Sequence, residues 1–243
     1  MSASVGQARQ SAKLRSRALQ REIMDLILER GLRHGDPLPT ELELVETFGV
    51  GRNTVREALK VLQAMGIVDV RHGYGMFVAS TNLDALAVTL EFHARMSLGQ
   101  GGREATELVD VRQALESELV PSSIDALDAD GLAAVASAVA WMDECAKAGR
   151  PLAEADRAFH RALYAPLRNS LLSSLLDVFW SAYSGLNRVL PADDAAATVA
   201  AHQAIYEAVA ARDKEGAAEL IRRHFDGARR TLAQLPQAGS AGR

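Results

Sequence analysis

The 243-residue sequence predicts a mainly α-helical protein, with an N-terminal winged helix-turn-helix followed by a C-terminal all-α antiparallel helical bundle. Two observations predict this architecture. Within the first 80 residues, three segments with helical spacing of apolar residues precede a strand, a glycine-rich turn and a second strand. From Leu83 onward no segment predicts a strand, and alanine, which favours closely packed helices, is abundant.

The chain divides into four predicted segments. They are a disordered tail (1–12), the winged helix-turn-helix (13–80), the helical domain (81–235) and a flexible tail (236–243). Residues 1–80 carry eleven Lys and Arg against nine Asp and Glu, whereas the remaining residues carry sixteen against twenty-two. A basic beginning ahead of an acidic body is typical of a nucleic-acid-binding head on a partner domain.

Composition excludes several classes of protein. The single cysteine, Cys145, cannot form an intramolecular disulfide, which favours a reducing compartment. The polar, basic N-terminus lacks the apolar core of a signal peptide. The longest apolar stretch, 132–142, is far shorter than the roughly 20 residues needed to span a bilayer. We therefore expect a cytoplasmic protein with no membrane partner.

Three helices are predicted in the head. The apolar side chains of the first recur at helical spacing, at Leu19, Ile23, Leu26 and Ile27. Gly31 follows as its C-terminal stop. Thr40 and Glu43 form a predicted capping box, in which each side chain satisfies a free backbone donor at the start of a short second helix. A third helix is predicted from about Gly51 to Ala64.

A β-hairpin is predicted after the third helix. Residues 67–70 and 76–78 have the composition of strands, and the glycine-rich segment 71–75 between them is typical of a turn. Three helices followed by a hairpin is the plan of a winged helix-turn-helix.

The outward side of the third helix carries the DNA-binding hypothesis. Its polar residues are Arg52, Asn53, Arg56, Lys60 and Gln63. Arginine can bond guanine bidentately and asparagine can pair with adenine, while a helix N-terminus offers amide donors to a phosphate. In the hairpin, Gly73 would let the backbone approach a groove closely, and Arg71 or His72 could contact phosphate. The alternative interpretation is a solvated basic face on a surface helix.

These segments resemble the GntR family of bacterial regulators. The matching stretches are PLPTE at 37–41, FGVGRNTVREAL at 48–59, GIV at 66–68 and GYGMFV at 73–78. The candidate DNA-binding residues are therefore Arg52, Asn53, Thr54, Arg56, Lys60, Arg71, His72 and Gly73. Two positions depart from the family pattern: Leu42 stands where the family usually has a DNA-contacting arginine, and Gly51 where it usually has Ser or Thr.

The second domain is predicted as a series of helices. They lie near 83–98, 104–126, 129–148, 151–165, 169–190, 195–212 and 214–234. Segments rich in glycine or proline separate several of them. Pro121 is expected to kink or shorten the helix that contains it.

Four side chains in this domain have the types and spacing of metal ligands. Asp156 and His160 are four residues apart and share a helix face, while His202 and His224 lie on two other predicted helices. If these helices converge, one carboxylate and three imidazoles can surround Zn²⁺, Ni²⁺, Mn²⁺ or Fe²⁺. The alternative is that each histidine is an ordinary core or surface residue.

The same residues are similar to the FCD effector domain of the FadR-type branch of the GntR family. That resemblance implies a metal site at Asp156, His160, His202 and His224. It also implies that Arg112 contacts an acidic effector, although an intrahelical ion pair with Glu116 is the alternative. Asn169 is interpreted as lining the pocket or as capping a helix. Trp141, Trp180 and Tyr183 are expected to be core residues.

The predicted function is transcriptional regulation. By resemblance we expect a homodimer that binds a palindromic operator in double-stranded DNA, in the cytoplasm at the nucleoid. A small organic acid bound at the metal would relieve repression, with activation by the acid as the alternative. Two other functions stay open: a regulator for which the metal itself is the signal, and a metal-dependent enzyme.

Overall fold

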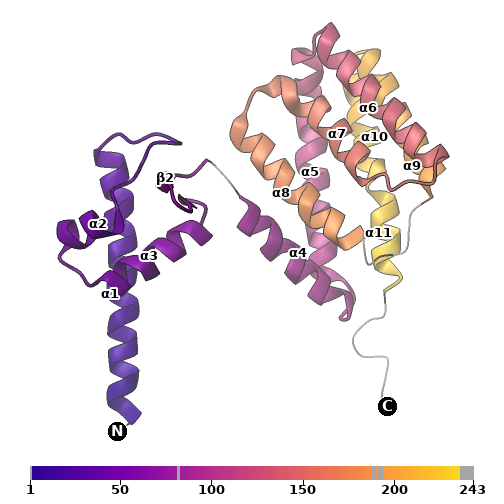
Figure 1. The fold of residues 1–243 in the computed structure, drawn as a ribbon. Helices are drawn as coiled ribbons and strands as arrows, with labels where there is room; N and C mark the ends of the chain where they lie inside the picture. Colours follow the sequence, from indigo (N-terminus) through magenta and orange to yellow (C-terminus); the bar gives the residue numbers. More distant parts are fainter. Residues whose placement is uncertain (1, 81–82, 188–189, 191–193, 236–243) are drawn as a thin grey trace, which may run out of the picture. The chain divides into compact units, whose positions relative to one another are not determined.

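The computed structural model describes residues 2–80, 83–187, 190 and 194–235, and the side chains of 2–13 and 187 are not among those described. The chain forms two compact units, Met1–Ala85 and Leu86–Arg243, and each is described here by itself (Figure 1). The predicted C-terminal tail, 236–243, lies outside the described residues. Among the described residues, no helix is both long and apolar enough to cross a membrane.

The first unit, called the head below, is a winged helix-turn-helix. Its elements are α1 (Ser2–Glu29), α2 (Glu41–Phe48), α3 (Arg52–Ala64), β1 (Val68–Arg71) and β2 (Gly75–Val78). The predicted capping box is present, because the Thr40 hydroxyl accepts from the Glu43 N–H and the Glu43 carboxylate accepts from the Thr40 N–H. Gly49 ends α2 in the left-handed conformation, with φ of 62°, and so allows the tight turn into α3.

The N-terminal tail is where the structure differs from the sequence prediction for the head. Residues 2–12, expected to be disordered, belong to α1. The buried side chains of Leu19 and Ile23 fix the C-terminal half of α1 against α3. Once a helix is nucleated, each further residue costs little, and the segment ahead contains the helix formers Ala, Gln and Arg and no proline. The helix therefore extends back to Ser2.

The hairpin, called the wing below, is antiparallel, with Val68 opposite Val78 and Arg71 opposite Gly75. One apolar core holds α1, α2, α3 and the wing together. Its buried members are Leu19, Ile23, Ile27, Leu38, Leu44, Val55, Ala58, Leu59, Leu62, Val68 and Met76. Because α3 contributes the residues of one side to this core, its opposite side is left to solvent.

The second unit is an all-α bundle in the part that the structure describes, which agrees with the predicted fold class. Its elements are α4 (Asp84–Leu98), α5 (Arg103–Ala126), α6 (Ala129–Lys147), α7 (Ala153–Tyr164), the 3₁₀ turn η1 (Ala165–Leu167), α8 (Ser170–Asn187), α9 (Ala195–Ala210), α10 (Lys214–His224) and α11 (Asp226–Ala233). In Figure 1, α5 runs through the bundle, where it packs against α7, α8, α10 and α11, while α6 packs against α7 and α9.

Two helices of the bundle differ from expectation. Pro121 does not shorten α5, which continues to Ala126 because Val120 and Ile124 on either side of the proline are fully buried in the core. The single helix predicted for 214–234 is divided at Phe225 into α10 and α11. Around this point the carbonyl of Arg222 accepts a hydrogen bond of 2.7 Å from the Gln113 side chain.

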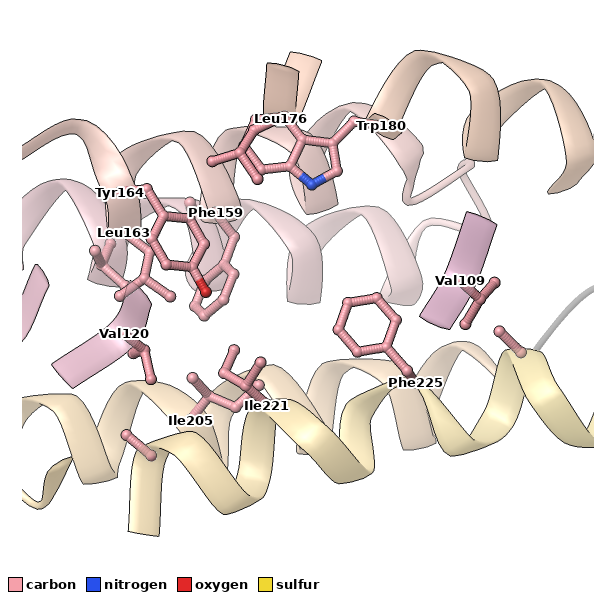
Figure 2. Close-up of a cluster of buried hydrophobic side chains, with 14 of the residues drawn as sticks. Val109, Val120, Phe159, Leu163, Tyr164, Leu176, Trp180, Ile205, Ile221 and Phe225 are labelled. Atoms are coloured by element: carbon pink, nitrogen blue, oxygen red, sulfur yellow. The ribbon is translucent and has the colours of Figure 1, made fainter. Parts of the chain in front are cut away.

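The core of the bundle is apolar and includes large aromatic side chains. Figure 2 shows part of it, with Phe159, Tyr164, Trp180 and Phe225 facing the interior. Trp180 and Phe159 are fully buried, as expected for core residues, whereas Trp141 is 39% exposed. Seven polar or charged residues are also buried in the described chain: Ser97, Arg112, Glu116, Ser117, Ser123, His160 and His202. Buried charges require partners, so these residues mark the place to search for a site.

Candidate functional site

The exposed side of α3 is the candidate nucleic-acid interface in the head. Arg52, Asn53, Arg56 and Lys60 are exposed and Thr54 is half-buried. The opposite side of the helix, with Val55, Ala58, Leu59 and Leu62, is buried. This division gives α3 a rigid attachment to the core and leaves its long polar side chains free to reach base edges and phosphates.

The cations on this face form only exposed ion pairs. Arg56 Nε lies 2.8 Å from Glu41 Oε2, and Lys60 Nζ lies 2.9 Å from Glu57 Oε1. Within the described part of the chain, Arg52 has no ion pair. Because exposed pairs of this kind contribute about 0–1 kcal/mol, a DNA phosphate can replace the carboxylates at little cost.

A groove of about 730 Å³ separates α3 from the wing. Its lining includes Arg56, Lys60, Gln63, Arg71 and His72. Arg71 is held in place by Asp69, at 2.8 Å, and by the ring of Phe77, with its guanidinium carbon 4.4 Å from the ring centroid. Gly73, at the turn of the wing, has φ of 81°, a conformation that favours glycine. The groove therefore has cationic side chains on both walls.

The two departures from the family pattern lie on α2 and at the start of α3. Leu42 is 52% exposed on α2, so an apolar side chain occupies a place where an arginine would reach solvent or DNA. Gly51 is the N-cap of α3 and offers no side-chain cap to the free N–H groups of the first turn.

The bundle contains the second candidate site. The four predicted metal ligands, Asp156 and His160 on α7, His202 on α9 and His224 at the end of α10, are brought together by the fold. One ligand atom from each lies within 4.8 Å of the others. We call these four residues the Asp–His cluster. Their convergence depends on the contacts of α6 with both α7 and α9, and of α9 with α10.

Other residues orient the histidines of the Asp–His cluster. Nδ1 of His202 donates to the carbonyl of Thr198 at 2.8 Å, so its Nε2 is the atom that faces Asp156, at 2.9 Å. Nδ1 of His160 lies 2.5 Å from the carboxylate of Glu116, and its Nε2 lies 3.5 Å from Asp156. A ligand histidine whose other ring nitrogen faces a carbonyl or carboxylate is the usual arrangement around a protein-bound metal.

The electrostatics of the cluster favour charged carboxylates. Burial would raise the pKa of Asp156, but His160 and His202 outweigh it and hold that pKa well below its usual value. Burial would raise the pKa of Glu116, but the attraction of His160 and of the arginine guanidinium paired with Glu116 outweighs it and lowers the pKa to about 2. Burial, reinforced by the two neighbouring imidazoles, holds the pKa of His224 well below its usual value. Burial would lower the pKa of His160, but Glu116 and Asp156 outweigh it and raise that pKa, so a metal ion would displace a proton from this imidazole. An ionised carboxylate and a neutral imidazole, as at Asp156 and His224, are the forms that bind a metal.

These atoms fit a divalent ion. Nε2 of His160 is buried without a hydrogen-bond partner in the described chain. Nε2 of His202 and Oδ1 of Asp156 lie 2.9 Å apart. Because Nδ1 of His202 carries the proton that it donates to a carbonyl, Nε2 of a neutral imidazole is an acceptor, as is Oδ1. Two acceptors at this distance need a proton or a cation between them. A cation beside the three imidazoles would satisfy all of these atoms, and its nitrogen and oxygen ligands suit Zn²⁺, Ni²⁺, Mn²⁺ or Fe²⁺.

Arg112 reaches the Asp–His cluster from α5. Its Nε donates to Glu116 at 2.6 Å, which is the ion pair foreseen as the alternative to effector binding. Its Nη2 lies 3.9 Å from Asp156 and has no hydrogen bond in the described chain. The ring of Phe225 lies 5.2 Å from its guanidinium carbon, close enough for a cation–π contact. Arg112 is therefore both paired with Glu116 and left with one free buried donor.

Sequence reasoning left two interpretations of Asn169 open and missed one contact of Glu116. Asn169 is exposed, and its Oδ1 accepts from the Leu172 N–H at 3.0 Å, so it caps α8, and its hydrogen bonds in the described chain go to that helix. Glu116 was considered only as a partner of Arg112, yet it also contacts His160. The spacing of Arg112 and Glu116, which places both on one face of α5, indicates their ion pair but gives no signal of the contact to His160.

Comparison with known proteins gives two family matches. Residues 15–78 match the model described as "Bacterial regulatory proteins, gntR family", and residues 107–227 match the FCD domain. An uncharacterised HTH-type transcriptional regulator of Mycobacterium tuberculosis is 31% identical over 209 residues, which cover 84% of each chain. The galactonate operon transcriptional repressor of Escherichia coli is 26% identical over 186 residues, 75% of this chain and 81% of the repressor.

A solved structure gives the same result for the fold. The Streptococcus agalactiae GntR structure matches with a TM-score of 0.63 at 26% identity, over 88% of this chain and 99% of that one. The similarity thus extends over both the head and the bundle.

Proposed function

Since this chain belongs to the GntR family of bacterial regulatory proteins and carries an FCD domain, which makes it a DNA-binding transcriptional regulator and not an enzyme, we propose that it is a repressor released by a small organic acid. The acid binds in the bundle beside a divalent metal ion held by the Asp–His cluster. The single observation that carries this proposal is the convergence of those four ligands with a buried arginine whose Nη2 has no hydrogen-bond acceptor in the described chain.

Each group of the proposed site has a specific role. Asp156, His160, His202 and His224 hold the ion, which when bound supplies a Lewis-acid position for a carboxylate oxygen. Glu116 and the carbonyl of Thr198 fix the orientation of two of the imidazoles. Arg112 directs its free Nη2 to a second oxygen of the acid. The related repressor named for galactonate supports an acid of this general kind.

We place DNA binding at the exposed side of α3 and in the wing. Arg52, Asn53, Thr54, Arg56 and Lys60 contact the major groove and its phosphates. From the wing, Arg71, His72 and Gly73 contact the adjacent backbone.

The protein acts as a homodimer on a palindromic operator, in the cytoplasm where the chromosome lies. Support for the dimer comes from α4, where Val88, Phe92 and Met96 follow one another at intervals of four residues and are 55–66% exposed. An apolar stripe of this kind is more typical of an interface than of a solvated surface. A two-fold dimer matches a two-fold operator. The acid changes operator affinity through a coupling free energy of about 1–3 kcal/mol.

DNA binding is tested with the full-length protein and fragments of its own genome. Arg52→Ala should weaken sequence-selective binding by about 1–3 kcal/mol and leave metal binding unchanged. Arg150→Ala, which removes an exposed arginine of the bundle, is the matched control and should bind DNA like the parent. Equal operator affinity in Arg52→Ala would contradict the assignment of α3 as the reading helix.

Metal and acid binding are tested by calorimetry on protein stripped with a chelator and reloaded with Zn²⁺, Ni²⁺ or Mn²⁺. His202→Ala should lose high-affinity metal binding, whereas the control His93→Ala, at an exposed histidine of α4, should retain it. Operator release by organic acids only in the metal-loaded protein supports the proposal. Release by metal alone, with no effect of any acid, would make the ion itself the signal.

A further inference from the structure

Trp180 on α8 has a polar group that the packing of the bundle leaves unused. The side chain is 1% exposed, and its indole N–H has no hydrogen-bond acceptor in the described part of the chain. Figure 2 shows the indole nitrogen pointing away from α8 into the bundle, on the side where Phe225 lies. A buried tryptophan N–H normally finds a partner, because leaving it without one is costly. Trp180 is therefore more than a filler of the core.

The indole of Trp180 borders the Asp–His cluster. Its ring centroid lies 5.6 Å from that of His160, and the guanidinium carbon of Arg112 lies 5.8 Å from the ring. The unused N–H thus belongs to the same region as the free Nη2 of Arg112. Two buried donors without acceptors, beside the proposed metal position, indicate that a ligand supplies the missing acceptors.

The other buried atoms of this region that lack a hydrogen bond already face a partner or the proposed metal position. Nδ1 of His160 and Oε2 of Glu116 face each other at 2.5 Å, and Nε2 of His160 points to the metal position. Among the buried side-chain atoms of the described chain that lack a hydrogen-bond partner, none is consequently left to accept from an N–H donor of a ligand. The ligand must present oxygens to Trp180 and Arg112 and must not present an ammonium group there.

We propose that the Trp180 N–H is an effector-contacting donor which, with Arg112, restricts the ligand to acids whose polar groups are oxygens, namely hydroxy- or oxo-carboxylates, and rejects the corresponding amino acids. This inference rests on the proposed function, because it assigns the ligand class of the same metal-containing site. A site built from donors discriminates strongly against a ligand that presents another donor, because both groups are then left unpaired in the interior.

The experiment uses matched pairs of acids that differ only in a hydroxyl or an ammonium group. Glycolate and glycine, L-lactate and L-alanine, and L-malate and L-aspartate are titrated into Zn²⁺-loaded full-length protein by calorimetry. At least one hydroxy acid should bind ten-fold or more tightly than its amino counterpart. Trp180→Phe, which keeps an aromatic ring but removes the N–H, should weaken that hydroxy acid ten-fold or more while Zn²⁺ affinity stays unchanged.

A second readout does not depend on the folding of the Trp180 variant. Trp141→Phe leaves Trp180 as the sole tryptophan, so its fluorescence reports directly on the bundle interior. Addition of the bound hydroxy acid should change that emission, and addition of its amino counterpart should not. Circular dichroism and thermal unfolding verify that both variants keep the fold.

The outcomes separate this inference from the proposed function. Unchanged hydroxy-acid affinity in Trp180→Phe, or amino acids binding as well as hydroxy acids, would overturn the assignment of Trp180 and leave acid sensing intact. Zn²⁺ binding without binding of any acid in the panel would overturn acid sensing, and the assignment of Trp180 would fall with it.

Discussion

The head and the bundle each present an arginine paired with a glutamate, and the two pairs differ in burial. Arg56 and Glu41 in the head have side chains 60% and 41% exposed, whereas Arg112 and Glu116 in the bundle are 2% and 0% exposed. Water solvates the two ions of the first pair whether or not they are in contact. Water does not replace a lost partner in the second pair, so an ion left alone in the interior is destabilised by its full desolvation free energy.

This difference matches the functions proposed for the two regions. A surface that reads DNA exchanges its partners, so each of its cations must be easily released from the protein. A site that holds a small ligand must keep its groups in fixed positions before the ligand arrives. Substitutions in the head should therefore act one residue at a time, whereas those in the Asp–His cluster and its neighbours should act on the whole site.

The largest expected effect comes from breaking the buried pair. Glu116→Ala leaves Arg112 without its carboxylate and removes the contact to His160. We expect the free energy of unfolding to fall by about 3–5 kcal/mol, as for other buried pairs that lose one member. Metal affinity should fall by about 10- to 100-fold, because the orientation of a ligand histidine is lost. Urea denaturation and metal titration measure the two effects.

The control for this substitution is Glu41→Ala in the head, which removes the carboxylate from the exposed pair with Arg56. Its effect on the free energy of unfolding should stay below about 1 kcal/mol. Similar losses in the two variants would show that burial does not distinguish the regions.

Sequence reasoning worked best where local signals and fold agree. The capping box at Thr40 and the wing around Gly73 are local features, and the structure contains both. The division of the last predicted helix at Phe225 was not predicted. Close to it the side chain of Gln113, 109 residues away in the sequence, donates to the carbonyl of Arg222, and no local sequence signal indicates such a contact. The helical extension of α1 to Ser2 was missed because the segment has no apolar periodicity of its own.

The same limit applies to the site. The spacing of Asp156 and His160 placed both on one helix face, but only the packing of α7, α9 and α10 brings His202 and His224 to them. The contact between Glu116 and His160 joins two helices and leaves no mark in the sequence. The free N–H of Trp180 is invisible for the same reason, since an unsatisfied donor is a property of the packed interior.

A smaller effect is expected from an ion pair on the outside of the bundle. It tests whether the burial of a pair, or its location in the bundle, determines how much the pair contributes to the free energy of unfolding. Asp177 accepts two hydrogen bonds of 2.8 Å from Arg161 and two, of 3.0 and 3.3 Å, from Arg157. Burial would raise the pKa of Asp177, but these two arginines outweigh it and lower the pKa. Because the group is partly exposed, Asp177→Asn should reduce the free energy of unfolding by no more than about 1 kcal/mol at neutral pH.

The pH dependence of the Asp177 variant has a defined sign. A carboxyl whose pKa is lower in the folded state adds stability above its usual value of 3.8, and this contribution is lost as the pH falls toward the folded value. The difference between parent and Asp177→Asn should therefore be constant from pH 7 to pH 5 and shrink below about pH 4. Urea denaturation across this range measures it, and a difference independent of pH would exclude the ionised carboxylate as its source.

The smallest effect concerns the N-cap of α3, where the head departs from its family. Gly51 has φ of −70° and ψ of 149°, a conformation open to any residue, and no atom lies within 4 Å of the position of an added Cβ. A serine hydroxyl there can accept from a free N–H of the first turn, so Gly51→Ser should stabilise the helix by a few tenths of a kcal/mol. Gly51→Ala, which adds a methyl group without an acceptor, is the matched control and should not stabilise it. Hydrogen exchange of the Asn53 amide measures the effect locally, because the Thr54 N–H already donates to the carbonyl of Gly51. Equal protection in the serine and alanine variants would show that the hydroxyl does not cap α3.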